Sequence, residues 1–452
     1  MRYDLLIRGG TLVTPEGVAE GDVAVADGTI AAVGPELPGA AGATIDARGL
    51  HVLPALIDAH VHFNEPGRTA WEGWATGGAA LAAGGGALCL EMPLNASPPT
   101  LDAASFALKR AAAEAASPVD FALWGGLTPD NRGRLDELAA CGAVGFKAFM
   151  SASGIADFAA ADDLTLYEGM AAAVRLGLPV AVHAESEALT GALAARALAE
   201  GRLGVRDYLA SRPVLAELEA VQRAILLAAE AGCALHIVHV SSGRGVALVA
   251  EARARGVDVS CETCPHYLVL AEEDVERIGA AAKCAPPIRD GATREALWSR
   301  LLSGQVDLVA SDHSPAPPEL KSPAPTGFFG SWGGIAGVQS TLELLLSEGH
   351  HRRGLGLAAV ARLTAGRVAE RFRLPRKGRL ALGADADLAL VDLGAEWTLE
   401  RADLRDRHRM SPYVGRRLTG RVVRTMRRGQ TIFLNGKVEG GGGGKLVRPA
   451  AR

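Results

Sequence analysis

Eight short apolar segments recur through the middle of this 452-residue chain, and each is followed by an alanine-rich helical or loop stretch. Buried parallel strands read as continuous apolar runs, and parallel neighbours need a crossover connection, which is usually a helix. Eight such units predict an α/β fold of the TIM type, a (β/α)8 barrel whose functional residues gather at the carboxyl ends of the strands. The predicted strands are residues 55–62, 87–92, 121–125, 144–149, 179–183, 234–240, 257–262 and 306–311.

Both ends of the chain show a different sequence pattern, which predicts short strands separated by turns. The first part shows this pattern at residues 4–7, 11–13, 23–26, 30–33 and 43–46, and it returns at 388–391, 422–426 and 431–434. We therefore predict a small β-sandwich domain built from residues 1–54 and 375–438, beside a barrel of residues 55–374. Five glycines at 440–444 predict that residues 439–452 form a flexible tail.

Six polar side chains stand at the ends of the predicted barrel strands. Because alternate residues of a strand face the same way, His60 and His62 can hold one ion from a single strand end. Imidazole and carboxylate groups suit zinc and similar divalent metals. The sequence therefore predicts a two-metal hydrolytic site with the ligands His60, His62, Lys147, His183, His239 and Asp312.

Lys147 is the unusual member of this set. A protonated amine repels a metal ion, so the alternative interpretation is a lysine that forms a salt bridge or extends to the surface. Burial beside cations favours the neutral amine, which can react with carbon dioxide.

Six motifs follow one another along nearly the whole chain. They are EPGR with WEG at 65–73, EMPLN at 91–95, KCAPPIR at 283–289, SDHSP at 311–315, WGGIAG at 332–337 and SPYVGR at 411–416. In this order they resemble the cyclic amidohydrolases of the amidohydrolase superfamily, and most closely the allantoinase family.

The resemblance implies two divalent metal ions, for which zinc is expected, while cobalt, manganese and iron also suit the ligands. It implies that Lys147 carries a carbamate made from carbon dioxide, whose two oxygens bridge the ions, and that His183 and His239 complete the second metal's shell. Asp312 would be both a ligand and the catalytic acid–base group that moves the proton of a metal-activated hydroxide. The resemblance also implies a homotetramer.

Three positions separate this chain from sister families. Dihydroorotases usually have an arginine where Asn64 stands and a histidine where Ala316 stands. Hydantoinases and dihydropyrimidinases usually have a tyrosine where Ala152 stands. Loss of the two carboxylate partners disfavours dihydroorotate as the substrate, and the missing tyrosine disfavours the hydantoinase alternative.

Allantoin is small, neutral and rich in amide groups, so its site needs hydrogen-bonding groups rather than a charge clamp. The candidate substrate contacts are Asn64, Cys284, Ser314 and Gly334. We expect hydrolysis of the hydantoin ring of allantoin to allantoate, in purine catabolism. The alternatives are a hydantoinase or dihydropyrimidinase, a dihydroorotase, and a non-catalytic homologue that uses the barrel for assembly.

Six further histidines are expected to be structural: His51, His236, His313, His350, His351 and His408. Cys261 and Cys264 have CxxC spacing, but there is no second CxxC pair, so they are expected to be buried or strand-end cysteines and not metal ligands. His266 lies near a strand end, and a supporting role behind the metal ligands is left open.

Charge and hydropathy exclude several partners. Lys plus Arg total 47 against 51 Asp plus Glu, so no basic field indicates a nucleic acid. No uninterrupted apolar run reaches the roughly 18 residues of a membrane helix, and the first residues do not resemble a signal peptide, so a cytoplasmic protein is expected. The proline- and glycine-rich residues 315–334 predict a mobile loop over the active site, with a packed static loop as the alternative.

Overall fold

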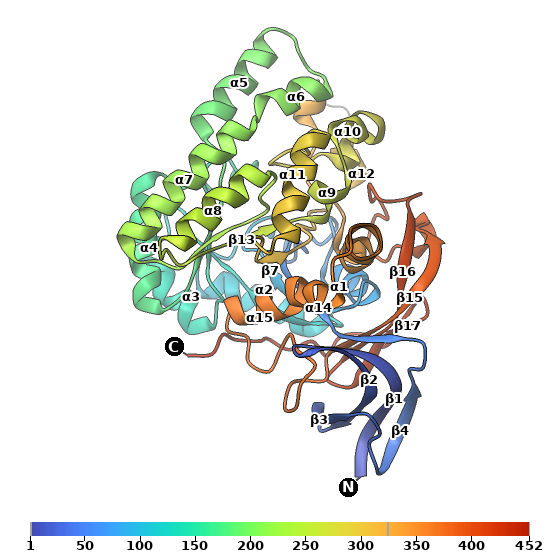
Figure 1. Cartoon of the computed structure of the whole chain (residues 1–452). Helices are drawn as coiled ribbons and strands as arrows, with labels where there is room; N and C mark the ends of the chain where they lie inside the picture. Colours follow the sequence, from blue (N-terminus) through green and yellow to red (C-terminus); the bar gives the residue numbers. More distant parts are fainter. Residues whose placement is uncertain (1, 323–324, 452) are drawn as a thin grey trace.

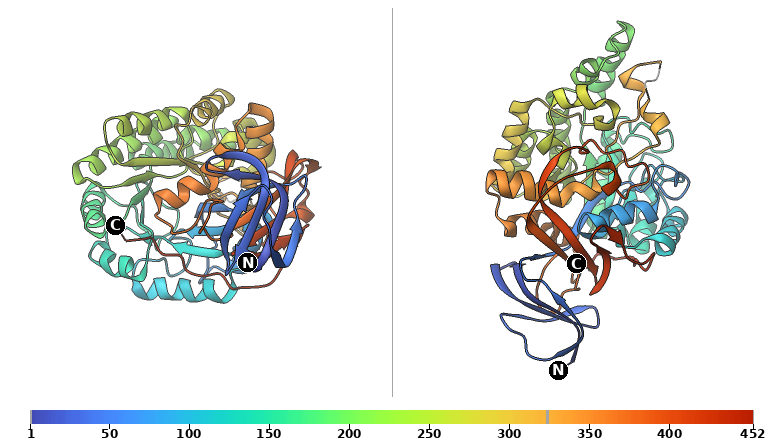
Figure 2. Two further views of the ribbon diagram at one scale, coloured as in Figure 1. Left: turned by 60° about the horizontal axis from the view of Figure 1, so that its bottom comes forward. Right: turned by 90° about the vertical axis from the view of Figure 1, so that its right-hand side faces the viewer.

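The two ends of the chain build one nine-stranded sheet. In this computed structural model, which describes residues 2–322 and 325–451, the strand order is β18-β17-β16-β15-β5-β1-β2-β3, with β4 paired to β1. The join is the antiparallel pair β5–β15, where Pro54 faces Leu388. Figure 2 shows the first strands, in dark blue, projecting from the helical body. The strands are β1 (Arg2–Thr14), β2 (Gly17–Ala26), β3 (Thr29–Gly34), β4 (Ala40–Asp46), β5 (His51–Pro54), β15 (Leu388–Thr398), β16 (Arg417–Arg427), β17 (Gln430–Leu434) and β18 (Lys437–Val438).

The middle of the chain is an α/β body whose strands pair in parallel. One sheet has the order β14-β13-β12-β11-β10-β9 and the other has the order β6-β7-β8. Their strands are β6 (Leu56–Val61), β7 (Gly86–Glu91), β8 (Asp120–Leu123), β9 (Gly125–Gly126), β10 (Phe146–Phe149), β11 (Val180–His183), β12 (Leu235–Ile237), β13 (Val259–Thr263) and β14 (Leu308–Val309).

Main-chain hydrogen bonds connect the two parallel sheets at both margins. On one side, Val144 N, which precedes β10, donates at 3.0 Å to the carbonyl oxygen of Leu123, the last residue of β8. On the other side, His62 N donates to His313 O at 2.7 Å, beside a parallel bridge between Val61 and His313. The first and last parallel strands therefore approach each other at their carboxyl ends.

Helices connect successive strands, and Figure 1 shows α4, α7 and α8 along one flank. Asp102 and Asp162 cap α2 and α4 by accepting main-chain N–H bonds, and Gly177 ends α4 with a φ of 66°. No helix within the described ranges is long and apolar enough to cross a membrane. The helices are α1 (Trp74–Ala83), α2 (Ala103–Ala116), α3 (Leu135–Cys141), α4 (Asp163–Leu176), α5 (Glu187–Ala199), α6 (Val205–Ser211), α7 (Val214–Ala231), α8 (Gly243–Ala254), α9 (Pro265–Val269), α10 (Glu272–Ile278), α11 (Gly291–Leu302), α12 (Pro318–Lys321), α13 (Thr341–Leu344), α14 (Leu357–Ala361) and α15 (Arg367–Arg371).

The carboxyl-terminal segment packs on the α/β body, which differs from the flexible tail that its glycines predict. Phe121 N, in β8, donates to Lys445 O at 3.1 Å, and Val447 N donates to Phe121 O at 2.7 Å. Further along, Ala450 N donates to Arg373 O. Because β8 is the edge of its three-stranded sheet, its free main-chain groups are available to the tail. Residue 452 lies outside the described residues.

Candidate metal centre

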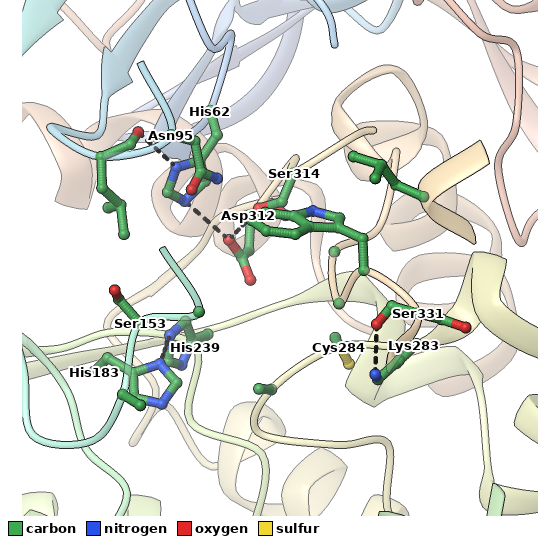
Figure 3. Close-up of a pocket in the computed structure, with 18 of the residues that line it drawn as sticks. His62, Asn95, Ser153, His183, His239, Lys283, Cys284, Asp312, Ser314 and Ser331 are labelled. Atoms are coloured by element: carbon green, nitrogen blue, oxygen red, sulfur yellow. Dashed lines mark hydrogen bonds and ion pairs between the residues drawn. The ribbon is translucent and has the colours of Figure 1, made fainter. Parts of the chain in front are cut away.

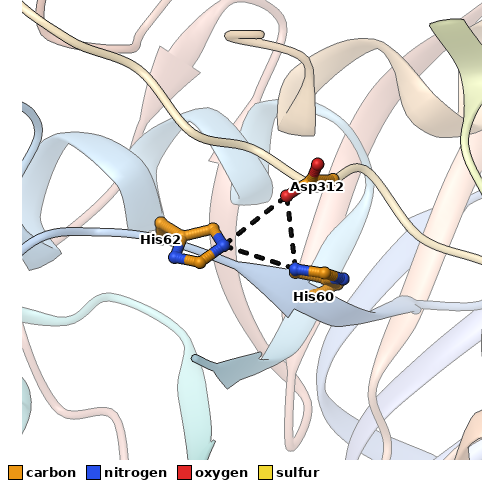
Figure 4. A group of neighbouring side chains, drawn as sticks. All are labelled: His60, His62 and Asp312. Carbon is orange, nitrogen blue, oxygen red and sulfur yellow. Dashed lines mark hydrogen bonds and ion pairs between the residues drawn. The ribbon is translucent and has the colours of Figure 1, made fainter. Parts of the chain in front are cut away.

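Three predicted ligands converge at the carboxyl end of β6. The Nε2 atoms of His60 and His62 lie 3.3 Å apart. Asp312, which follows β14, places Oδ1 3.2 Å from Nε2 of His60 and 3.5 Å from Nε2 of His62 (Figure 4). All three side chains are buried, and their ligand atoms lie within 4.8 Å of one another. This geometry can hold one divalent ion.

The other two predicted histidines form a second pair beside the first group. Nδ1 of His183, at the end of β11, lies 3.1 Å from Nε2 of His239, which follows β12 (Figure 3). The ring centroids of His239 and His60 are 5.4 Å apart, and the ring of Phe149 stacks on His183 at 4.6 Å. The two histidine pairs therefore face a common space.

Lys147 extends from β10 into the same buried region. Its Nζ lies 3.8 Å from the Phe149 ring centroid, and its charge opposes protonation of all four histidines. Burial lowers the pKa of the Lys147 amine to about 7, although Asp312 and Glu262 favour the charged form. A substantial fraction of this amine is therefore neutral and nucleophilic near pH 7.

Two carboxylates that the sequence analysis missed hold the outer nitrogens of the histidines. Nδ1 of His60 lies 2.6 Å from Oε1 of Glu262, and Nε2 of His183 lies 2.8 Å from Oε2 of Glu185. Such partners fix the ring orientation and the tautomer of a metal-ligating histidine. Glu185 stands two residues after His183, and Glu262 ends a predicted strand, so strand alternation was an available signal for both.

Burial favours the neutral form of all four histidines, although Asp312 and Glu262 outweigh burial at His60 and raise the pKa of that side chain. Burial lowers the pKa of His62 to about 4 and holds the pKa of His239 well below its usual value. Neutral imidazoles offer a nitrogen lone pair, which is the form that binds a divalent ion. His60, His62 and Asp312 therefore form a donor set that suits a divalent ion, and His183 and His239 add two imidazoles with lowered pKa values beside it.

The centre opens into a cavity of about 530 Å³. Of the four predicted substrate contacts, Gly334 lines this cavity together with Cys284 and Ser314, which are labelled in Figure 3. Asn64 is fully buried outside the lining, where its Nδ2 donates to Pro315 O at 3.3 Å. The lining also includes polar residues that the sequence analysis did not select: Asn95, Ser153, Tyr208, Arg212, Lys283 and Ser331.

The remaining histidines near the strand ends lie outside the cavity lining. Nε2 of His313 lies 3.3 Å from Glu72, and its Nδ1 accepts a bond from Gly337 N. His236 lies behind the centre, 3.1 Å from Oε2 of Glu262. His266 is completely buried, and neither ring nitrogen has a hydrogen-bond partner among the described residues.

The chain is similar to known proteins over most of its length. Residues 51–432 match the profile of the amidohydrolase family. The chain belongs to that family. This amidohydrolase is 62% identical over 447 residues to an allantoinase of Rubrobacter xylanophilus, an alignment that covers 99% of this chain and 98% of the relative. It is 58% identical to an allantoinase of Solibacter usitatus, with 99% and 97% covered.

Solved structures show the same architecture. The L-hydantoinase (dihydropyrimidinase) from Arthrobacter aurescens superposes on this amidohydrolase with a TM-score of 0.96 at 36% identity, covering 99% of this chain and 100% of that one. The dihydropyrimidinase from Brevibacillus agri NCHU1002 gives a TM-score of 0.91 at 31% identity, with 99% of each chain covered.

Proposed function

We propose that this amidohydrolase is an allantoinase, which hydrolyses the hydantoin-ring amide of allantoin to allantoate in cytoplasmic purine catabolism. The observation that carries the proposal is 62% identity to an allantoinase over nearly the full length of both chains. The cavity supports it, because its cationic groups are already engaged: Arg212 pairs with Glu185 at 2.6 Å, and Lys283 donates to main-chain carbonyls. Such a cavity suits a neutral substrate.

The proposed centre contains two divalent ions, with zinc as the expected metal. His60, His62 and Asp312 would hold one ion, and His183 and His239 the other. The neutral amine of Lys147 would attack the carbon of carbon dioxide, forming an N–C bond and releasing one proton. The resulting carbamate has two oxygens able to bridge the ions. Bound ions would lower the pKa of a water molecule and polarise the ring carbonyl.

Asp312 is the proposed proton carrier. Burial would raise the pKa of this carboxyl, but His60, His62 and His239 outweigh burial and hold the pKa well below its usual range. The side chain is therefore a carboxylate that can accept a proton from the attacking water. Ser314 Oγ donates to Oδ1 of Asp312 at 3.0 Å and fixes the orientation of the carboxylate. Asp312 would then deliver the proton to the leaving ring nitrogen, whose C–N bond breaks.

We also propose that the parallel strands close into a (β/α)8 barrel of residues 55–374, with residues 1–54 and 375–438 as the composite β-domain. The hydrogen bonds of Val144 and His62 at the two margins support closure. The similarity to the Arthrobacter aurescens structure supports the same architecture.

The proposed assembly is a homotetramer. The neighbouring helices α4 and α7 carry exposed apolar side chains, with Leu164 56%, Leu215 59% and Leu226 60% exposed. Exposed apolar side chains on two neighbouring helices support an interface with another subunit. Light scattering of the purified protein gives the number of chains per particle.

A hydantoinase is the second candidate, because the solved structures cited above carry that activity in their names. A substrate panel separates the two candidates. Purified, metal-loaded protein is assayed with allantoin, hydantoin, dihydrouracil and dihydroorotate. The proposal predicts the highest kcat/KM for allantoin, and a higher value for hydantoin or dihydrouracil would favour the second candidate.

A further inference from the structure

Two buried lysines at the edge of the cavity have no part in the proposed chemistry. Lys283 is 4% exposed and Lys321 is 9% exposed. Within the described residues, neither forms an ion pair with a carboxylate, although burying an unpaired charge is costly. The charge of each lysine must therefore be compensated by hydrogen bonds to uncharged groups.

Burial lowers the pKa of Lys283 to about 8 and that of Lys321 to about 7, and main-chain carbonyl oxygens accept from every donor of the two amino groups in their protonated form. Nζ of Lys283 donates to Phe328 O at 2.6 Å, Phe329 O at 2.9 Å and Ser331 O at 2.6 Å. The second lysine donates to Ala280 O at 3.1 Å, Trp332 O at 3.0 Å and Gly334 O. A lysine ammonium has three N–H donors, so neither group can bind a substrate without giving up one of these bonds.

Five of the six accepting carbonyls belong to residues 328–334, which we call the pocket wall. The wall lines the cavity through Phe329, Trp332, Gly334 and their neighbours. The last residue of the wall is also bonded to the segment that contains Lys283: Gly334 N donates to Lys283 O at 2.7 Å. Figure 3 shows Lys283 bonded to Ser331 beside Cys284.

Further contacts hold the wall in this position. The Lys283 ammonium lies 4.5 Å from the ring centroid of Tyr208, which also packs edge-on against Phe328 and Phe329. Gly334 passes so close to Ser314 that an added Cβ would lie 2.2 Å from Ser314 O. These contacts favour the packed loop over the mobile lid for residues 325–334, while residues 323–324 of the predicted loop lie outside the described residues.

We infer that Lys283 and Lys321 are positioning residues that fix the pocket wall against Ser314 and Cys284 and so set the shape of the substrate cavity. The inference rests on the proposed function only for the identity of the substrate. Glycines at 330, 333 and 334 leave the wall few local constraints, so the two ammonium groups supply the order that substrate binding needs. Loss of one group frees three carbonyls and loosens the wall without touching the metal ligands.

The test compares Lys321→Met and Lys283→Met with Lys437→Met, which removes a charge from an exposed lysine. Both wall variants should raise the KM for allantoin by roughly 10- to 100-fold, while kcat falls by less than about 3-fold. Metal content should match that of the parent protein, and the control should keep the parent KM. An unchanged KM in both wall variants, or a kcat that falls together with metal content, overturns the inference.

Hydrogen exchange of residues 328–334 gives a readout that needs no substrate. Lys321→Met should accelerate exchange in the wall and leave β6 and β11 unchanged. Lys321→Arg provides a second variant if methionine prevents folding, because a planar guanidinium cannot direct its donors to the same three carbonyls. Unchanged exchange in the variant that folds contradicts the inference, whereas failure of the parent protein to hydrolyse allantoin contradicts only the proposed function.

Discussion

His183 and His239 face each other through different ring atoms, Nδ1 of the first lying 3.1 Å from Nε2 of the second. The difference arises because Nε2 of His183 is already held by Glu185 at 2.8 Å. His60 has the opposite arrangement, with Nδ1 held by Glu262 and Nε2 directed to Asp312. Each carboxylate therefore determines which nitrogen its histidine would offer to an ion in the proposed centre.

The two carboxylates should control different ions. Glu185→Gln should weaken metal binding at the His183 pair by roughly 10- to 100-fold, because the amide lacks the charge that makes the imidazole a strong donor. Glu262→Gln should act instead on the ion held by His60. Metal per chain is measured after dialysis against a graded chelator, with Glu230→Gln on the surface as the control. Equal retention in all three variants would show that the carboxylates do not tune the ligands.

Asp312→Asn should abolish turnover while the protein stays folded and at least partly metallated. Asparagine keeps the shape and one coordinating oxygen, but it cannot accept the proton of the attacking water. General acid–base catalysis is typically worth on the order of 10²- to 10⁴-fold in rate. His313→Asn is the matched neighbour and should cost less, since His313 bonds to Glu72 and Gly337 instead of lining the cavity. The measurement is kcat with metal content recorded for both variants. A loss fully explained by missing metal would leave Asp312 as a ligand without the proton-carrier role.

Lys147→Ala should lose the bridging group and with it most of the bound metal and activity. Addition of a short carboxylic acid should restore part of both, because a carboxylate can occupy the place of the carbamate and bridge the ions with its two oxygens. The assay measures metal content and turnover with and without the acid. Full activity of Lys147→Ala without any added acid would refute the carbamate.

Removal of residues 440–452 should lower the thermal stability of the protein. The truncation deletes the main-chain bonds to β8 and uncovers the surface under Leu446 and Val447, which pack against the apolar core. Each lost hydrogen bond costs about 1 kcal/mol, so Tm should fall by a few degrees. Lys445→Ala is the control. Lys445 bonds to Phe121 and Asp120 through its main-chain atoms, so this substitution should leave the bonds and the Tm unchanged. A truncated protein with the Tm of the full chain would show that the tail contributes nothing.

The sequence predicted the parallel strands and the clustering of His60, His62 and Asp312, but it could not predict local backbone geometry. Strand alternation placed His60 and His62 together, and the two Nε2 atoms meet at 3.3 Å. His239 and Asp312, in contrast, lie beyond their strands with φ values of 39° and 46°. A positive φ in a non-glycine residue is imposed by surrounding contacts, so apolar periodicity contains no signal for it.

The missed groups share a physical reason. Strand alternation indicates which way Glu262 faces, but only the tertiary fold shows that it reaches His60 and His236, which lie on two other strands. The packed tail was missed because glycine content reports local freedom, whereas the edge of β8 is created by the tertiary fold. Contacts between distant parts of the chain decided all of these features.

The proposed centre contains two metal ions bridged by carboxylated Lys147. The most direct measurement combines elemental analysis with ¹³C NMR of protein reconstituted with metal and ¹³C-labelled bicarbonate. The account predicts two divalent ions per chain and a carbamate signal that disappears in Lys147→Ala. Active protein with one ion or none per chain and no carbamate signal would contradict it.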